Sequence, residues 1–196
     1  PTYDVIAVTP HIDVRSEAIS VHSLRGAVCH AAYGMNRQQY PNDIALVYLD
    51  DVSAFENVEI ARLETAETRL LPRNLDDVYI AAWGRNGGTQ YLQGGRVWIS
   101  EPGEAVLLAE KIGTRGPNLG DSGAPLYAQT PNGPLVIGIL SQVTQDRAQN
   151  GDRSIYIRLS AAHQWIHQTM AICEQEGQYL CSQAVPALLE TAEPIN

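Results

Sequence analysis

Gly120-Asp121-Ser122-Gly123-Ala124-Pro125-Leu126 is the stretch that decides how this chain is interpreted. Gly-Asp and Ser-Gly pairs are ordinary turn formers. A serine flanked by glycines on a tight turn presents its hydroxyl to a carbonyl carbon, although a surface turn with a capping serine would leave a similar pattern. The order of other motifs along the chain favours a catalytic nucleophile at Ser122.

Three more segments accompany the serine turn in a fixed order. Together with the serine turn, these segments resemble the signature segments of the chymotrypsin/trypsin-like serine peptidases. The serine turn departs from the family pattern at one position, where Ala124 stands in place of the second glycine after the serine. The resemblance runs from near Tyr3 to Ile166. The three segments are Val28–Tyr33, Asn42–Val47 and Ala82–Gly84.

The resemblance implies a role for each residue of the serine turn. Ser122 is the expected nucleophile, Asp43 the acid that orients a histidine, and the amides of Gly120 and Ser122 the oxyanion hole. Glycine suits position 120 because a Cβ would constrain the backbone angle that aims this amide. Asp121 is expected to pair with a freed N-terminal amine, for which Pro1 is a poor match. The alternative is a turn aspartate satisfied by nearby amides.

The catalytic histidine of the family has no clear counterpart. His11 is nearest to the expected place, but it fits a turn better and lies too close to Asp43; His22 and His30 fit structural roles. Either an N-terminal segment or a second chain carries the histidine, or the protein is a non-catalytic homologue that binds a protein partner. We favour an N-terminal segment or a second chain as the source of the histidine. Without such a segment the first barrel would lack several strands as well as the histidine, and it would expose long unpaired strand edges.

Substrate preference is expected to follow from residues near the primary pocket of the family. Gly116 supplies no charge at the pocket base, Val143 narrows the mouth, and Ser154 lies in the wall. We therefore expect cleavage after small or medium aliphatic residues, as in elastase-like members. An alignment slip of one residue would put Arg153 in the wall instead and favour acidic substrates.

A second group of pocket residues is expected to pair with the substrate backbone as an added strand. It comprises Ser141, Gln142 and Val143. Ser141 also resembles a family serine close to the triad aspartate, so it can support Asp43 or be an ordinary strand serine.

Short apolar runs between turn signals predict an all-β fold of barrel or sandwich type. The resemblance implies two six-stranded antiparallel β-barrels with the site between them, the first barrel incomplete in this chain, and a C-terminal helix. Ser160 is expected to cap that helix over Ala161 to about Cys173. The runs are Val5–Val8, Ile19–Val21, Ala45–Leu49, Val78–Trp83, Val97–Ile99, Val106–Ala109, Leu135–Ser141 and Ser154–Leu159.

The chain is expected to divide near its end. Residues 1–172 form the peptidase domain without its N-terminal segment, and residues 173–196 form an extension or linker. Cys173 and Cys181 can form a local disulfide in an oxidising compartment, which agrees with a secreted or periplasmic protein. Cys29 is then left over, either buried and inert or bridged to a partner.

Composition limits the other classes of function. The formal charge is −9 with no block of like charges, which argues against binding to nucleic acid or to an anionic membrane. No apolar run approaches the roughly 20 residues of a membrane span, and no signal-peptide pattern occurs at Pro1. His163 and His167 share a helix face, but without a third ligand they are expected to be exposed histidines rather than a metal site. We expect no cofactor and no metal, only a protein or peptide substrate.

Overall fold

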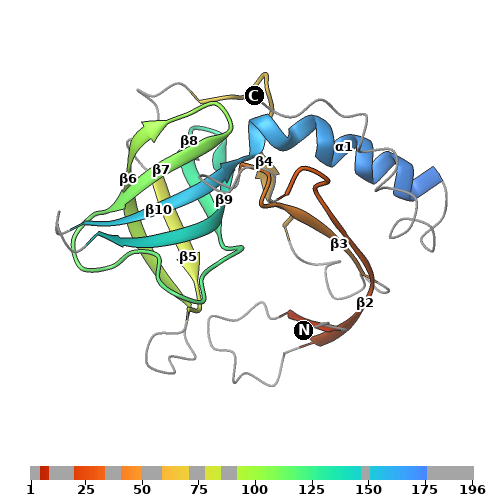
Figure 1. Cartoon of the computed structure of the whole chain (residues 1–196), viewed down its shortest axis with the longest axis horizontal. Coiled ribbons are helices and arrows are strands. Elements are labelled where there is room, and N and C mark those ends of the chain that lie inside the picture. Colours follow the sequence, from red (N-terminus) through yellow and green to blue (C-terminus); the bar gives the residue numbers. More distant parts are fainter. Residues whose placement is uncertain are drawn as a thin grey trace.

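The computed structural model describes residues 5–8, 20–33, 41–49, 59–70, 78–84, 92–146 and 151–175. Within these ranges the chain forms strands that group into two sheets, followed by one long helix (Figure 1). The strands are β1 (Val5–Val8), β2 (Ser20–Cys29), β3 (Ala45–Leu49), β4 (Arg62–Leu63), β5 (Val78–Ala82), β6 (Gln93–Pro102), β7 (Val106–Lys111), β8 (Pro125–Thr130), β9 (Gly133–Asp146) and β10 (Gly151–Arg158), and the helix is α1 (Leu159–Gln175).

Six strands close into an antiparallel barrel. Their order is β10-β7-β6-β5-β8-β9, and β9 pairs back onto β10 (Figure 1). Alternation along β5 shows how the core forms, because Val78, Ile80 and Ala82 are buried while the residues between them are half-exposed. This closed barrel and the helix that follows it confirm the fold class expected from the sequence.

The N-terminal part forms a smaller sheet with the order β1-β2-β3. Both pairings are antiparallel, with Val5 opposite Ser23 and Cys29 opposite Ala45. A further bond from the His30 amide to the Ile44 carbonyl, 3.0 Å long, continues the second pairing beyond the strands. Among the described residues this sheet does not close into a barrel, which agrees with the expectation of an incomplete first barrel.

Helix α1 follows β10 without a loop and lies beside the smaller sheet (Figure 1). Its buried residues pack with Val28 of β2, and the Trp165 ring lies 5.0 Å from the His30 ring. The helix begins one residue before Ser160, whose buried hydroxyl has no hydrogen-bond partner among the described residues. The expectation that Ser160 is the N-cap was therefore wrong.

This helix is not long and apolar enough to cross a membrane, and no other helix occurs in the described ranges.

A buried ion pair fixes the segment after β4 to the barrel. Strand β4 runs parallel to β9, and directly after it Glu64 is fully buried. Arg158 at the end of β10 donates to both carboxylate oxygens, at 3.0 and 3.1 Å, and also to the carbonyls of Gly103 and Leu70. A buried charge is tolerated where its partners satisfy it in this way.

The cysteines and the expected domain boundary are only partly described. Cys29 is an exposed thiol, which corrects the expectation that it would be buried, and a bridge to a partner stays a prediction. Cys173 is buried within α1, so the helix continues past the expected boundary at residue 172. Cys181 and the rest of the expected extension lie outside the described residues, and the disulfide between Cys173 and Cys181 stays a prediction.

Candidate active site

The serine turn has a backbone geometry that glycine allows. Gly120 and Gly123 have φ angles of 93° and 88°, a region that glycine adopts readily. Ser122 between them is exposed. Two hydrogen bonds fasten the turn to β9, from the Gly123 amide to the Leu140 carbonyl at 2.8 Å and from the Leu140 amide to the Ala124 carbonyl at 2.9 Å.

The next residue of β9 contacts the predicted triad acid. Ser141 Oγ donates a hydrogen bond of 2.6 Å to Oδ2 of Asp43, which lies just before β3. Ser141 belongs to the closed barrel and Asp43 precedes a strand of the smaller sheet, so this bond joins the two parts of the molecule. It favours the supporting role of Ser141 over that of an ordinary strand serine.

Ser122 and Asp43 face one groove of about 690 Å³. The groove lies between the serine turn, β3 and α1, and most of its surface is apolar. An apolar wall strengthens the interaction between charged groups, because little water screens them. The groove also holds residues that sequence reasoning did not assign to the site: Cys29, Tyr33, Ile44, Ala45, Leu46, Leu63, Gly123, Ile139, Leu140, Leu159, Ile166 and Met170.

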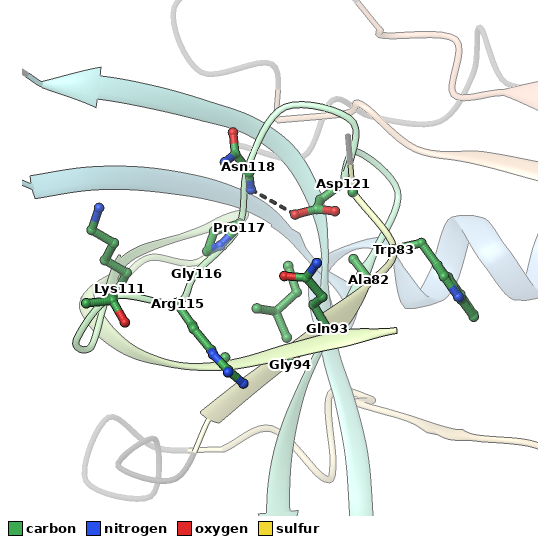
Figure 2. A pocket seen from close by; sticks show the side chains of 14 residues that line it. Ala82, Trp83, Gln93, Gly94, Lys111, Arg115, Gly116, Pro117, Asn118 and Asp121 are labelled. Atoms are coloured by element: carbon green, nitrogen blue, oxygen red, sulfur yellow. Dashed lines mark hydrogen bonds between the residues drawn. The ribbon is translucent and has the colours of Figure 1, made fainter. Parts of the chain in front are cut away.

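Asp121 points away from this groove into a separate pocket of about 160 Å³ (Figure 2). Its Oδ2 accepts a hydrogen bond of 2.8 Å from the Asn118 amide, as expected for a turn aspartate. Its Oδ1 is buried and has no hydrogen-bond partner among the described residues. In Figure 2 the side chains of Lys111 and Arg115 lie toward the opposite end of the pocket. One carboxylate oxygen is thus free to bind a donor that enters the pocket.

Two glycines make room for this pocket. Gly84 has a φ of 60°, and a Cβ there would lie 2.8 Å from Asp121 Oδ1. A Cβ at Gly116 would lie 2.6 Å from Cβ of Lys111. In the sequence Gly84 stood out only as part of the Ala82–Gly84 segment. Its position beside the Asp121 carboxylate depends on the tertiary structure. Gly116 also lines the Asp121 pocket, and its place at the base of the primary pocket stays a prediction.

The other expected pocket residues lie on neighbouring strands. Val143 on β9 is directly opposite Ser154 on β10 and packs against the barrel core. Ser154 is fully buried and donates to the Ala109 carbonyl at 3.1 Å, and Gln142 lies opposite Ile155. None of Gln142, Val143 and Ser154 lines the groove that holds Ser122.

Comparison with known proteins identifies the family behind this geometry. The sequence profile of the family described as Trypsin matches residues 1–166, which is most of the chain. The chain belongs to the trypsin family of serine proteases. It is also 24% identical over 187 residues to a collagenase of Hypoderma lineatum, an alignment that covers 87% of this chain and 70% of that protein.

The described histidines of this trypsin-family chain do not line the groove of Ser122. They are His22, His30, His163 and His167. His30 is buried against Trp165, and its Nδ1 accepts a hydrogen bond of 3.2 Å from the Ala32 amide. Burial lowers the pKa of His30. His11 lies outside the described residues, so its assignment stays a prediction.

Proposed function

We propose that this protein is a serine endopeptidase that forms an acyl-enzyme on Ser122. The observation that supports it best is the groove shared by Ser122 and Asp43, in which Ser141 holds the carboxylate by a 2.6 Å hydrogen bond. Membership of the trypsin family supports the same reaction class. The substrate is a protein or peptide chain.

In the proposed reaction Ser122 Oγ attacks the carbonyl carbon of the scissile bond, and an imidazole takes the hydroxyl proton. The imidazole then gives that proton to the leaving amine as the C–N bond breaks. Water hydrolyses the resulting ester and restores the serine. Asp43 orients the imidazole and stabilises its positive charge, so it accepts no proton itself.

We assign the oxyanion hole to the amides of Gly120 and Ser122. The hydrogen bonds that shape this turn use the amides of Asp121, Gly123 and Ala124. The amides of Gly120 and Ser122 have no hydrogen-bond partner among the described residues, which leaves them available to a developing negative charge. The positive φ of Gly120 supports this role, since that conformation sets the direction of the amide.

We propose that the general base is an imidazole that lies in the groove and belongs to a residue outside the described ranges. An imidazole there would complete the set of nucleophile, base and acid. An N-terminal segment or a second chain is the proposed source, and His11 is a further candidate to be tested. If no imidazole enters the groove, the alternative function is that of a protein-binding homologue without catalysis.

Asp121 is proposed to form an activation ion pair with a freed N-terminal amine. The buried and unpartnered Oδ1 beside an open pocket supports this role, because an ammonium group would supply the donor that this oxygen lacks among the described residues. A buried carboxylate is costly unless it is paired. Formation of the pair would hold the neighbouring serine turn in place, which implies a zymogen that needs cleavage.

Preference for small or medium aliphatic residues before the scissile bond is also proposed. Val143 and Ser154 lie directly opposite each other in the register of β9 and β10. Arg153 points to the other side of β10 and pairs with Glu110 at 3.5 Å, so it supplies no charge beside Val143.

Secretion or a periplasmic location is proposed from family membership.

Labelling with a fluorophosphonate probe tests the proposed reaction. We expect an adduct on Ser122, located by mass spectrometry, in the complete protein and none in the Ser122→Ala variant. A His11→Ala variant distinguishes sources of the base: unchanged labelling excludes His11. Absence of any Ser122 adduct, under conditions that label a control peptidase, would contradict the enzyme and favour the binding homologue.

A further inference from the structure

Two histidine rings lie in contact on the outer side of α1. The ring centroids of His163 and His167 are 4.3 Å apart, with an angle of 58° between the ring planes. His167 is exposed and His163 is half-exposed. Neither ring makes a hydrogen bond or ion pair within the described residues. The ring nitrogens are therefore available to a ligand from solvent.

The helix holds these rings in a fixed relation. Its opposite side is buried, with Ala162, Trp165 and Thr169 in the interior. The turn that carries both histidines is thus part of a packed element rather than a mobile loop. Little conformational freedom of the backbone would be lost when a ligand joins the two rings.

Two histidines four residues apart on a helix can bind one zinc ion. Each nitrogen would lie about 2.0–2.1 Å from the metal, so two nitrogens of a tetrahedral shell are roughly 3.3 Å apart. Rings whose centroids are 4.3 Å apart can place their nitrogens at that separation by small rotations of the side chains.

A carboxylate supplies negative charge beside this pair. Glu67 precedes the helix in sequence but interacts electrostatically with His163. Its Oε2 accepts a hydrogen bond of 2.7 Å from Thr65 Oγ1. This bond orients the carboxylate on its loop, and a carboxylate near the two rings favours a cation there.

We propose that His163 and His167 chelate a divalent transition-metal ion, Zn²⁺, whose remaining ligands come from solvent, with Glu67 providing nearby charge. Among the described residues no three His, Cys, Asp or Glu side chains already converge, so the described part of the chain contributes two direct ligands. The site is separate from the groove of Ser122, and the proposal does not depend on the proposed protease activity.

Isothermal titration of the untagged, complete protein with Zn²⁺ tests the site. We expect saturable binding of one ion per chain and a rise in melting temperature, because a ligand that binds only the folded state stabilises it. His163→Gln and His167→Gln should each weaken binding by about tenfold or more. The matched controls Gln164→Ala and Gln168→Ala lie on the same helix and should bind as the unchanged protein does.

Two results would overturn the proposal. One is the absence of saturable Zn²⁺ binding. The other is a double variant, His163→Gln with His167→Gln, that keeps the original isotherm while its far-UV circular dichroism shows a folded protein. Glu67→Gln should weaken binding less than either histidine change, and an unchanged affinity would remove the carboxylate from the site.

Discussion

Ser141 Oγ lies 2.6 Å from Oδ2 of Asp43, although the two residues are 98 positions apart in the chain. The bond fixes the Asp43 carboxylate, which lies beside the smaller sheet, to strand β9. Ser141 directly follows Leu140 in β9, and the backbone amide and carbonyl of Leu140 hold the serine turn. One side chain of the closed barrel therefore holds the carboxylate of the predicted triad acid next to the strand to which the serine turn is hydrogen-bonded.

Replacing Ser141 by alanine removes this bond. Because hydrogen bonds to charged groups contribute about 1.5–3 kcal/mol, we expect unfolding at lower denaturant and labelling of Ser122 about ten times slower. Ser100→Ala is the matched control, since Ser100 also donates from a strand, at 3.3 Å to the Leu108 carbonyl, but away from the groove. Equal labelling rates in both variants would contradict a role for Ser141 in holding Asp43.

Gly120→Ala should affect the oxyanion hole beyond its effect on stability. A Cβ at a φ of 93° is strained by about 1–2 kcal/mol. Gly133, the first residue of β9, has a φ of 94° with nothing within 4 Å of an added Cβ, so Gly133→Ala gives similar strain far from Ser122. We expect similar losses of stability, but a fall of about 10²- to 10³-fold in labelling for Gly120→Ala alone. Parallel loss in both variants would indicate general unfolding.

The buried pair of Glu64 and Arg158 predicts a large cost when one partner is neutralised. Glu64→Gln should lower the free energy of unfolding by about 3–5 kcal/mol, because the guanidinium stays buried without a charged partner. Glu110→Gln, which breaks the exposed contact with Arg153, should change it by less than about 1 kcal/mol. Denaturant unfolding measures both, and similar small effects would show that the buried pair is dispensable.

His30 should make stability depend on pH. Burial lowers its pKa, so the unfolded chain binds a proton more readily than the folded protein does. The contribution is fully present above the unfolded pKa of about 6.5 and is lost as pH falls toward the lower, folded value. His30→Asn can keep an acceptor for the Ala32 amide without titrating. We expect its unfolding free energy to vary less between pH 7 and pH 5, and an identical slope would contradict the assignment.

Val143 provides a test of substrate preference. If its side chain narrows the primary pocket, Val143→Gly should raise kcat/KM for peptides with a large apolar residue before the scissile bond, relative to those with alanine or valine. Thr144→Gly changes the neighbouring, exposed position of the same strand and should leave the ratio unchanged. A strong preference of the unchanged protein for Lys or Arg would overturn the pocket assignment.

Most strands could be predicted from local patterns, and the exceptions have physical reasons. Alternation and turn residues indicated β3 with its observed bounds and β5 to within one residue. Strand β8 was overlooked because Pro125 begins it directly after the serine turn, although Leu126 and Ala128 alternate inward. Strand β4 has only two residues and forms through a parallel pairing with Leu135 and Val136, which no local pattern reveals.

By itself the sequence determined the serine turn, the acid before an apolar strand, and the family to which both belong, because tight turns and strand alternation depend on residues close together in the chain. Tertiary structure alone decided that Ser141 holds Asp43, that Gly116 lines the pocket of Asp121, and that one oxygen of Asp121 is left without a partner among the described residues. Such contacts join distant residues, and their geometry results from the packing of the whole barrel, where many weak interactions together fix positions that no short segment specifies.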